Sequence, residues 1–325
     1  MEFRVALAQI APRLGEVDAN LELAAERITA ARGEGADLVV FPELALTGYL
    51  LQDLVPEVAM AADDHRLGAL SREAPGTLIA VGFVEETADH RYCNSAALLR
   101  DGELVGLHRK VYLPTYGLFD EARFTSEGDR IRTYDVGPPI GRIGLSVCED
   151  FWHPFVPMLQ AHDGASLLVN IAAGPSRAPG SEAGMVAITG WHKMQDTYAL
   201  LGTVALAFCN RVGNEEGLTF WGGSRLLAAD GSVAAEAPLW EEALVVGTLD
   251  TDDVRMQRYS LPILADERPE LTRRELDRII AERAGLPAPD EMTAEADEPH
   301  RAAAGSVPVS RSDLPAASRT PDAVS

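Results

Sequence analysis

Apolar residues between positions 3 and 250 fall into short segments of two kinds. Segments of strand length, either alternating or apolar throughout, occur at residues 3–10, 37–41, 78–84, 92–99, 103–108, 140–147, 166–171, 204–210 and 243–249. Segments with apolar residues at helical spacing occur at residues 20–32, 58–72, 154–162 and 184–200. Because helical and strand segments are interleaved, the pattern predicts an α/β fold in which helices cover sheets.

Two turn signals connect strands directly. Arg100-Asp101-Gly102 and Ala229-Asp230-Gly231 have the composition of tight hairpin turns, the second within residues 224–237. Both halves of the chain therefore mix helix-linked and hairpin-linked strands, and the strands are too numerous for one small sheet. We expect a layered sandwich of sheets and helices.

The C-terminal part of the chain changes character. Residues 270–284 have the spacing of an amphipathic helix, and Gly285 follows it. Residues 287–325 are rich in Ala, Pro, Ser, Asp and Glu and show no periodicity. We therefore predict one domain over residues 1–286 and a disordered acidic tail over residues 287–325.

Charge and composition narrow the function classes. The chain has 28 basic and 50 acidic residues, a formal net charge of −22, so nucleic acid phosphates and anionic lipids would repel it. No apolar run reaches the length of a membrane-spanning helix, and the N-terminus has no signal-peptide pattern. Three scattered cysteines favour a reducing compartment over a disulfide framework, which predicts a cytoplasmic protein.

Three segments place a reactive residue directly after an apolar strand. In the first, the strand at residues 37–41 leads to Glu43, in a loop bounded by Pro42 and Gly48. A glutamate is most often a solvated surface residue. A carboxylate held in a partly apolar loop is instead suited to be a general base.

The second segment holds Lys110, in the run His108-Arg109-Lys110. A solvated basic patch is the ordinary interpretation of such a run. However, Lys110 and Lys193 are the only lysines among the 28 basic residues, so a lysine here indicates a place where arginine would not serve. A compact ammonium is suited to stabilise an oxyanion.

The third segment ends at Cys148, where a strand meets the start of a helix. Backbone N–H groups and the helix dipole at such a turn are expected to lower the pKa of the thiol and favour a nucleophilic thiolate. A lone cysteine is more often a small buried apolar residue. That interpretation suits Cys93 and Cys209, which lie inside strand patterns.

A base, a cation and a thiol are together what amide hydrolysis requires. The stretches FPELALTGY, HRKVYLPTYGLFDE and VCEDFW also resemble those of the nitrilase (carbon–nitrogen hydrolase) superfamily, in the family's order and within residues 3–250. They are most similar to the glutaminase domain of glutamine-dependent NAD synthetase. The resemblance implies a four-layer αββα sandwich that assembles as a dimer or a multiple of dimers.

The resemblance also implies roles for individual residues. Glu43 would take the thiol proton, Cys148 would attack an amide carbonyl, and Lys110 would stabilise the oxyanion, with Glu121 supporting Lys110. The residues expected around the substrate are Tyr116, Phe119, Glu149 and Trp152. We expect no cofactor and no metal, because His153, His162 and Asp163 lack the spacing of metal ligands.

Two departures from the synthetase pattern are visible. No Ser-Gly-Gly-x-Asp-Ser phosphate loop occurs, so we expect this chain alone not to make NAD. Where glutaminase domains typically carry serines that hold glutamine, this chain has Ala172 and Gly174, which puts glutamine in doubt as a substrate. Ser176 and Arg177 are the residues that could substitute for those serines.

Several functions remain open at this stage. A stand-alone amidase acting on a small linear amide is the leading hypothesis. A glutaminase subunit that passes ammonia to a separate synthetase, a nitrilase, and a catalytically silent ligand-binding or scaffold protein are the alternatives. A Cys148–histidine hydrolase using His108 or His192 would leave Glu43 and Lys110 without a role.

Overall fold

Two six-stranded sheets contain most of the strands in the computed structural model, which describes residues 1–176 and 182–286. The first has the order β15-β1-β2-β3-β4-β5, with bounds Ala243–Asp250, Glu2–Gln9, Leu38–Val40, Leu78–Glu86, Tyr92–Arg100 and Glu103–Arg109. The second has the order β14-β13-β10-β8-β7-β6, with bounds Val233–Glu236, Arg225–Leu227, Ala205–Asn210, Leu167–Ala172, Gly141–Val147 and Thr133–Gly137. A small third sheet joins β11 (Val212–Glu215), β12 (Leu218–Trp221) and β9 (Pro175–Ser176).

The side chains of each central strand alternate between two apolar cores. In β1, Val5 and Leu7 belong to the cluster between the two sheets, whereas Ala6 and Ala8 belong to the cluster beneath the outer helices. Since successive side chains of a strand point to opposite faces, both faces of the first sheet are covered. The continuous apolar runs seen in the sequence are explained by this double burial.

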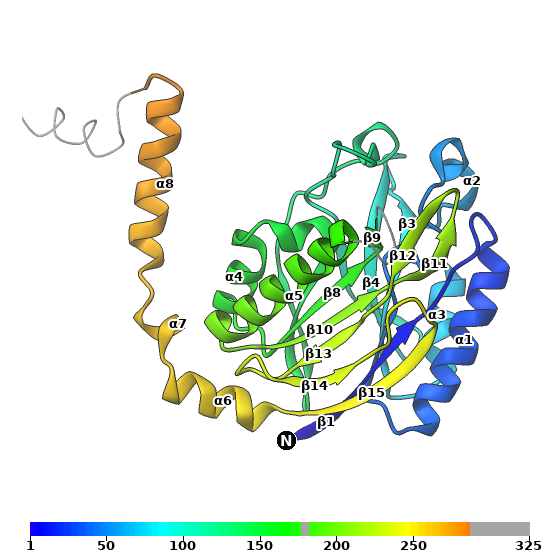
Figure 1. Ribbon diagram of the computed structural model, residues 1–325, viewed down its shortest axis with the longest axis horizontal. Helices are drawn as coiled ribbons and strands as arrows, with labels where there is room; N and C mark the ends of the chain where they lie inside the picture. The colour runs from blue at the N-terminus through cyan, green and yellow to red at the C-terminus, as the bar shows by residue number, and fades with distance from the viewer. Residues whose placement is uncertain (177–181, 287–325) are drawn as a thin grey trace, which may run out of the picture. The chain divides into compact units, whose positions relative to one another are not determined.

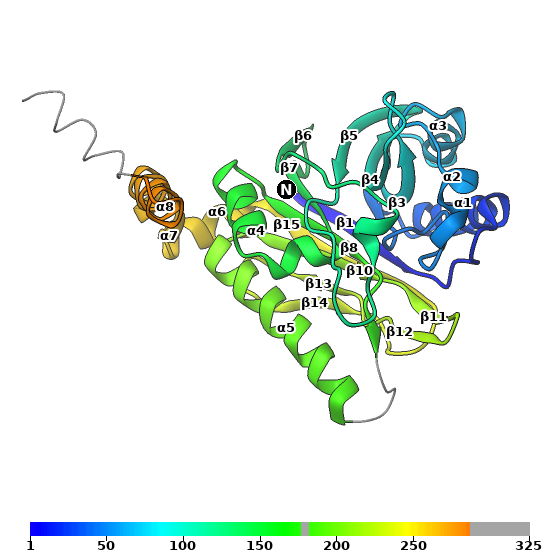
Figure 2. The same cartoon turned by 90° about the horizontal axis from the view of Figure 1, so that it is seen from above.

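Helices form the two outer layers. α1 (Val17–Gly33) and α3 (His65–Arg72) cover the first sheet, and α4 (Phe155–His162) and α5 (Glu182–Gly202) cover the second. Figures 1 and 2 show the two pairs on opposite sides of the facing sheets. The predicted four-layer αββα sandwich is confirmed.

One predicted helix is broken. The pattern at residues 58–72 predicts a single helix, but the structure has α2 (Val55–Val58) and a separate α3. Between them Met60 forms a β-bridge with Glu85, and Asp64 accepts a hydrogen bond from the backbone N–H of Arg66 to cap α3. A local cap and a bridge to a distant strand therefore override the helical spacing.

The C-terminal helices follow the last strand of the first sheet. α6 (Thr251–Ser260) and α7 (Ile263–Asp266) complete a unit that spans Met1–Asp266. The predicted helix near residues 270–284 is α8 (Pro269–Arg283), which belongs to a second unit and has no buried residue. Residues 287–325 lie outside the described part of the chain.

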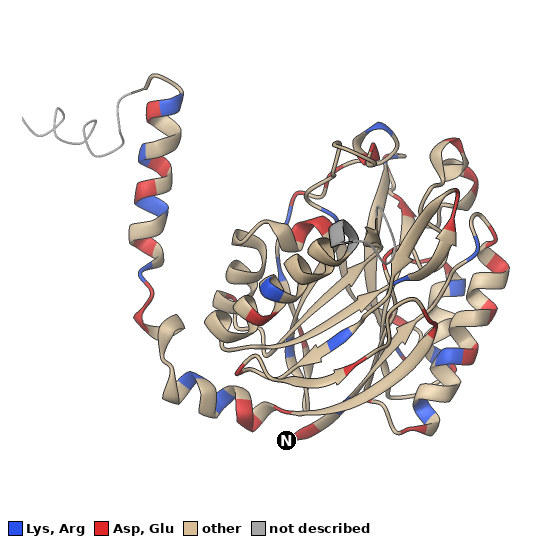
Figure 3. Ribbon diagram, viewed as in Figure 1, with Lys and Arg blue, Asp and Glu red and all other residues tan. Residues whose placement is uncertain are grey.

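Charged residues are concentrated outside the strands. Figure 3 shows most of the Asp, Glu, Lys and Arg residues on helices and loops. Over the described residues, the search for a helix long and apolar enough to span a bilayer finds none. Charged residues buried beside the strands are exceptions, and Glu43, Lys110 and Asp150 are among them.

Candidate active site

Glu43, Lys110 and Cys148 each follow the end of a strand. Lys110 comes directly after β5 and Cys148 directly after β7, while Glu43 lies in the turn after β2. Gly82 of β3 makes room for that turn, because a Cβ on Gly82 would lie 2.5 Å from the backbone nitrogen of Leu44. Glu43 and Lys110 extend from the first sheet and Cys148 from the second, so the three meet where the sheets face each other.

A buried lysine between two carboxylates forms the centre of the site. The Nζ atom of Lys110 donates to Oε1 of Glu43 at 2.7 Å and to Oε1 of Glu121 at 2.8 Å. The side chains of Lys110 and Glu43 are fully buried. Burial acts to lower the pKa of Lys110, but Glu121 and Glu43 outweigh it and raise the pKa well above its ordinary value, so this lysine is a fixed cation.

Glu43 is held at both of its oxygens. Oε1 also accepts from Nδ2 of Asn94 at 2.7 Å, and Oε2 accepts from the backbone N–H of Ala173 at 2.7 Å. Those donors come from β4 and from the loop after β8, on opposite sheets. A buried carboxylate with three donors has one orientation, which pre-organises it for proton transfer.

Cys148 begins the 3-10 helix η3 (Cys148–Trp152) with a left-handed backbone, φ = 44°. Such a conformation is strained for a residue with a side chain, and strain of this kind is often found at functional sites. Our expectation of a lowered thiol pKa is wrong. Burial and the charge of Glu43 raise the pKa of Cys148 well above its ordinary value, although Lys110 and the Ala173 N–H act to lower it.

The His108-Arg109-Lys110 run is not a solvated patch. Each of its members faces a different carboxylate: His108 donates to or accepts from Asp150 at 2.8 Å, and Arg109 makes two hydrogen bonds to Glu85, the shorter at 2.6 Å. Lys110 donates hydrogen bonds to Glu43 and Glu121. Since successive strand residues point to opposite faces, the run distributes three partly or fully buried basic side chains on two sides of the end of β5.

Asp150 was not singled out from the sequence. Its Oδ1 accepts from the backbone N–H groups of Val111 at 2.9 Å and Tyr112 at 3.0 Å. Its Oδ2 accepts from the backbone N–H of Val147 at 3.0 Å and contacts His108. This fully buried carboxylate therefore ties the backbone after Lys110 to the backbone before Cys148. The feature of the sequence that could have indicated this role is an acidic residue two positions after Cys148.

Four predicted substrate residues form what we call the site mouth: Tyr116, Phe119, Glu149 and Trp152. The Tyr116 hydroxyl donates to Glu149 at 2.9 Å, and Tyr116 packs edge-on against Phe119 with centroids 5.7 Å apart. Trp152 packs edge-on against Trp191 of α5. Tyr116 is 57% and Trp152 is 42% exposed, so the mouth reaches solvent whereas the cluster behind it does not.

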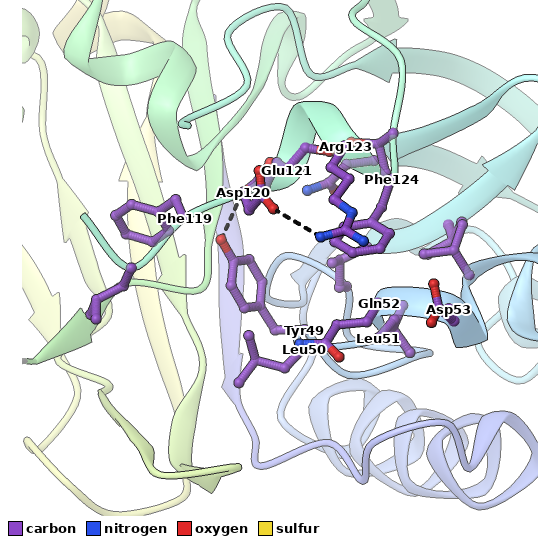
Figure 4. Close-up of a pocket in the computed structure, with 16 residues that line it drawn as sticks. Tyr49, Leu50, Leu51, Gln52, Asp53, Phe119, Asp120, Glu121, Arg123 and Phe124 are labelled. Atoms are coloured by element: carbon purple, nitrogen blue, oxygen red, sulfur yellow. Dashed lines mark hydrogen bonds and ion pairs between the residues drawn. The ribbon is translucent and has the colours of Figure 1, made fainter. Parts of the chain in front are cut away.

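Tyr49 is a second residue that sequence reasoning missed. Its hydroxyl donates to Oε1 of Glu121 at 2.6 Å (Figure 4). A cavity of about 220 Å³ adjoins this contact and is lined by Tyr49, Phe119 and Glu121, among others. Cys148 does not line this cavity. Phe119 is thus shared between the mouth and the cavity.

The loop in which serines were expected is tightly packed. Ala172 belongs to the apolar cluster beneath α5. A Cβ on Gly174 would lie 2.9 Å from Nε1 of Trp221, so no side chain fits there without a shift. Ser176 is buried in β9. Arg177 lies outside the described residues.

The remaining candidates have other surroundings. Nε2 of His108 faces Asp150, and within the described residues neither His108 nor His192 makes a hydrogen bond to Cys148. Cys93 and Cys209 are fully buried in strands. Lys193 is exposed on α5. Within residues 1–176 and 182–286, no group of three or more His, Cys, Asp and Glu side chains is arranged to hold a metal ion.

Comparison with known proteins identifies the family. The carbon–nitrogen hydrolase family model matches residues 4–259, so the chain belongs to the carbon–nitrogen hydrolase family. It is 34% identical over 259 residues to the glutamine-dependent NAD(+) synthetase of Thermotoga maritima, a match that covers 77% of this chain and 42% of that relative. The chain thus spans less than half of the length of that relative.

Two solved structures share the fold over nearly all of their own length. A carbon–nitrogen hydrolase from Helicobacter pylori superposes with a TM-score of 0.76 at 24% identity, covering 86% of this chain and 99% of that one. A mutant of the amidase from Nesterenkonia sp. AN1 superposes with a TM-score of 0.68 at 25% identity, covering 83% and 95%. The predicted family is therefore confirmed.

Proposed function

We propose that this protein hydrolyses the carbon–nitrogen bond of a small linear amide through a thioester on Cys148, releasing ammonia. The observation that carries the proposal is the buried Glu43–Lys110 contact of 2.7 Å, whose two charges both act on the pKa of the Cys148 thiol. Burying two charges carries a desolvation penalty that their mutual attraction often does not repay, so such a pair adds little stability. A further role for the pair is consistent with its presence here. The Nesterenkonia structure is described as a covalent addition of the acetamide moiety of fluoroacetamide at its active site cysteine, which supports a cysteine-based reaction in a relative.

The first half of the proposed reaction forms the thioester. The Cys148 thiol gives its proton to Glu43 as its sulfur forms a bond to the amide carbonyl carbon. Because burial and Glu43 raise the thiol pKa, an adjacent base is needed for this step at neutral pH. The oxyanion that develops is stabilised by the ammonium of Lys110 and by the backbone N–H beside Cys148.

The second half releases both products. The carbon–nitrogen bond breaks, and the nitrogen leaves as ammonia with the proton held by Glu43. Glu43 then takes a proton from water, whose oxygen attacks the thioester carbon, and the carbon–sulfur bond breaks. The proton returns to the thiol, and the carboxylic acid product departs through the mouth. Glu121 holds Lys110 in place throughout.

A glutaminase is the second candidate, and one observation favours it. Glu149 directly follows Cys148 in the chain, and its carboxylate is fixed by the Tyr116 hydroxyl, a geometry suited to hold the amino group of an amino-acid amide. The named activity of the Thermotoga relative is consistent with this assignment. Glutamine would then be the substrate, with a separate synthetase as the acceptor of ammonia.

Ammonia release from a panel of linear amides, nitriles and glutamine tests the proposal. We expect turnover of at least one amide, and a loss on the order of 10⁴-fold or more in Cys148→Ala. Cys209→Ala, which replaces a buried strand cysteine, is the matched control and retains activity. A folded wild type that releases ammonia from none of these compounds, or a Cys148→Ala variant with full activity, would contradict the proposal. The first result would favour a silent binding protein.

A further inference from the structure

A second buried ion pair lies behind Tyr49, outside the residues assigned above. The Nη1 atom of Arg211 donates to Oε2 of Glu215 at 2.8 Å, and the side chains are 1% and 5% exposed. The guanidinium of Arg211 also lies 4.1 Å from the ring centroid of Phe220 in β12. Arg211 and Glu215 come from β11 and the residue before it, in the small third sheet.

Glu215 accepts hydrogen bonds from the loop that carries Tyr49. Its Oε1 accepts from the backbone N–H of Tyr49 at 2.9 Å and of Leu50 at 2.7 Å. The Tyr49 ring packs edge-on against Phe220, with centroids 5.9 Å apart. The Tyr49 side chain is therefore fixed at its backbone by Glu215, at its ring by Phe220 and at its hydroxyl by Glu121.

These contacts form a continuous chain that ends at the reacting groups. Arg211 holds Glu215, and Glu215 holds the backbone of Tyr49. The Tyr49 hydroxyl reaches Glu121 (Figure 4). Glu121 in turn contacts Lys110. Each link is 2.9 Å or shorter and at least partly buried, so a displacement at one end is transmitted to the other.

We propose that Glu215, clamped by Arg211, is a positioning residue that sets the place of the Lys110 ammonium through Tyr49 and Glu121. This inference rests on the proposed function, since Lys110 must have an oxyanion to stabilise for its place to matter. Loss of the clamp would lower turnover more than it weakens substrate binding, because the mouth residues do not take part in the chain of contacts.

A double-mutant cycle separates this role from ordinary stabilisation. We expect Glu215→Gln to lower kcat by about tenfold with little change in KM, and Tyr49→Phe to do the same. In the Tyr49→Phe background, Glu215→Gln is expected to change kcat by less than about twofold, since the link to Glu121 is already cut. Asp196→Asn on α5, which removes the charge that faces the buried Arg225 of β13, is the matched control and has the same small effect in both backgrounds.

Two results would overturn the proposal. One is a tenfold loss of kcat from Glu215→Gln that persists in Tyr49→Phe. The other is a Glu215→Gln variant with unchanged kcat and a lowered melting temperature, which would make the pair a purely structural element. Melting temperatures of all variants are measured alongside.

Alkylation of Cys148 by iodoacetamide gives a readout that does not need a substrate. The titratable groups that act on this thiol are Glu43, Lys110, Glu121, Tyr49 and Tyr116. Burial raises the pKa of Glu121, whereas Lys110 and the hydrogen bond from the Tyr49 hydroxyl act to lower it. The charge of Glu121 is in turn one of the factors that raise the pKa of Cys148. We therefore expect Tyr49→Phe to shift the curve of alkylation rate against pH to lower pH.

The same profile distinguishes failure of this proposal from failure of the proposed function. Glu215→Gln is expected to give a shift in the same direction as Tyr49→Phe, with no further shift in the double variant and none in Asp196→Asn. If the wild type hydrolyses no amide but these shifts appear, the proposed function fails, while the coupling from Glu215 through Tyr49 and Glu121 to Cys148 is still demonstrated. An unchanged profile in Glu215→Gln contradicts the positioning role whatever the substrate.

Discussion

The buried cluster of Glu43, Lys110 and Glu121 and the exposed site mouth lie side by side but satisfy their polar groups in different ways. In the cluster, Lys110 is fully buried, and two carboxylates neutralise it at 2.7 and 2.8 Å. At the mouth, Tyr116 is 57% exposed and its hydroxyl has one carboxylate partner, Glu149. Water can replace a lost contact at the mouth but not in the cluster.

Under the proposed function, this difference would separate the chemical step from substrate selection. A group without water has no alternative partner, so any change in the cluster is transmitted to its neighbours. Mouth residues can change with little effect on the groups behind them. We therefore expect cluster variants to affect kcat and stability, and mouth variants to affect the choice of substrate.

Lys110→Met is expected to have the largest effect. It leaves the carboxylates of Glu43 and Glu121 buried together without a cation, which we expect to lower the free energy of unfolding by about 3 to 5 kcal/mol. Turnover should fall by about 10³-fold. Lys193→Met, at the exposed lysine of α5, is the matched control and should leave both quantities unchanged. Denaturant unfolding and ammonia release measure them, and a stable, active Lys110→Met variant would remove the distinction between cluster and mouth.

Asp150→Asn comes next. An amide group at this place turns one acceptor into a donor that faces backbone N–H groups, so the link between Lys110 and Cys148 weakens. We expect a loss of about 2 to 4 kcal/mol in unfolding free energy and about 10²-fold in kcat. Asp163→Asn is the control, because Asp163 also accepts a backbone N–H but its side chain is 53% exposed. Equal effects at the two aspartates would argue against a special role for Asp150.

The pH dependence of Cys148 alkylation tests the electrostatics of the cluster. Since burial and Glu43 raise the thiol pKa well above 9.0, the reactive thiolate is still increasing at pH 9. We expect the iodoacetamide rate to rise about tenfold per pH unit up to that pH without levelling. Peptide mapping assigns the label to Cys148, with Cys148→Ala as the blank. A rate that levels off near neutral pH would show a lowered pKa instead.

Glu149→Gln is expected to have the smallest and most selective effect. It removes the negative charge at the mouth while keeping its size, so amides that carry an amino group should lose about fivefold in kcat/KM. Amides without a charged group should be unaffected, and they serve as the internal control. Equal losses on both kinds of amide would place Glu149 within the cluster rather than at the mouth.

The sequence predicted the parts of the site that follow apolar strands. Glu43, Lys110 and Cys148 were found because each is a reactive residue at the end of such a strand. Glu121, which supports Lys110, was indicated by the family resemblance. Asp150, Tyr49 and Glu215 were not found, because their contacts join distant segments: Glu215 contacts the Tyr49 backbone across 166 residues. Nothing in the local sequence around Glu215 indicates that contact.

The error about Cys148 has a related cause. Local reasoning counted the helix that begins at Cys148, which favours a thiolate. The structure adds burial and the charge of Glu43, which come from the facing sheet and act in the opposite direction. A layered sandwich could be predicted because alternation and strand number are properties of whole segments, whereas the four-layer arrangement was implied by the resemblance to the family. The break between α2 and α3 could not, because it depends on a bridge to β3.

The four hydrogen bonds of Asp150 have a consequence for altering this enzyme by directed evolution. Asp150 reaches backbone atoms on both sides of the site, so an insertion or deletion between residues 108 and 112 or 147 and 150 would break several contacts at once. We expect most variants in a library that changes the length of those segments to be inactive. Diversity placed at Tyr116, Phe119 and Trp152 would change the substrate range while leaving the shared anchor intact.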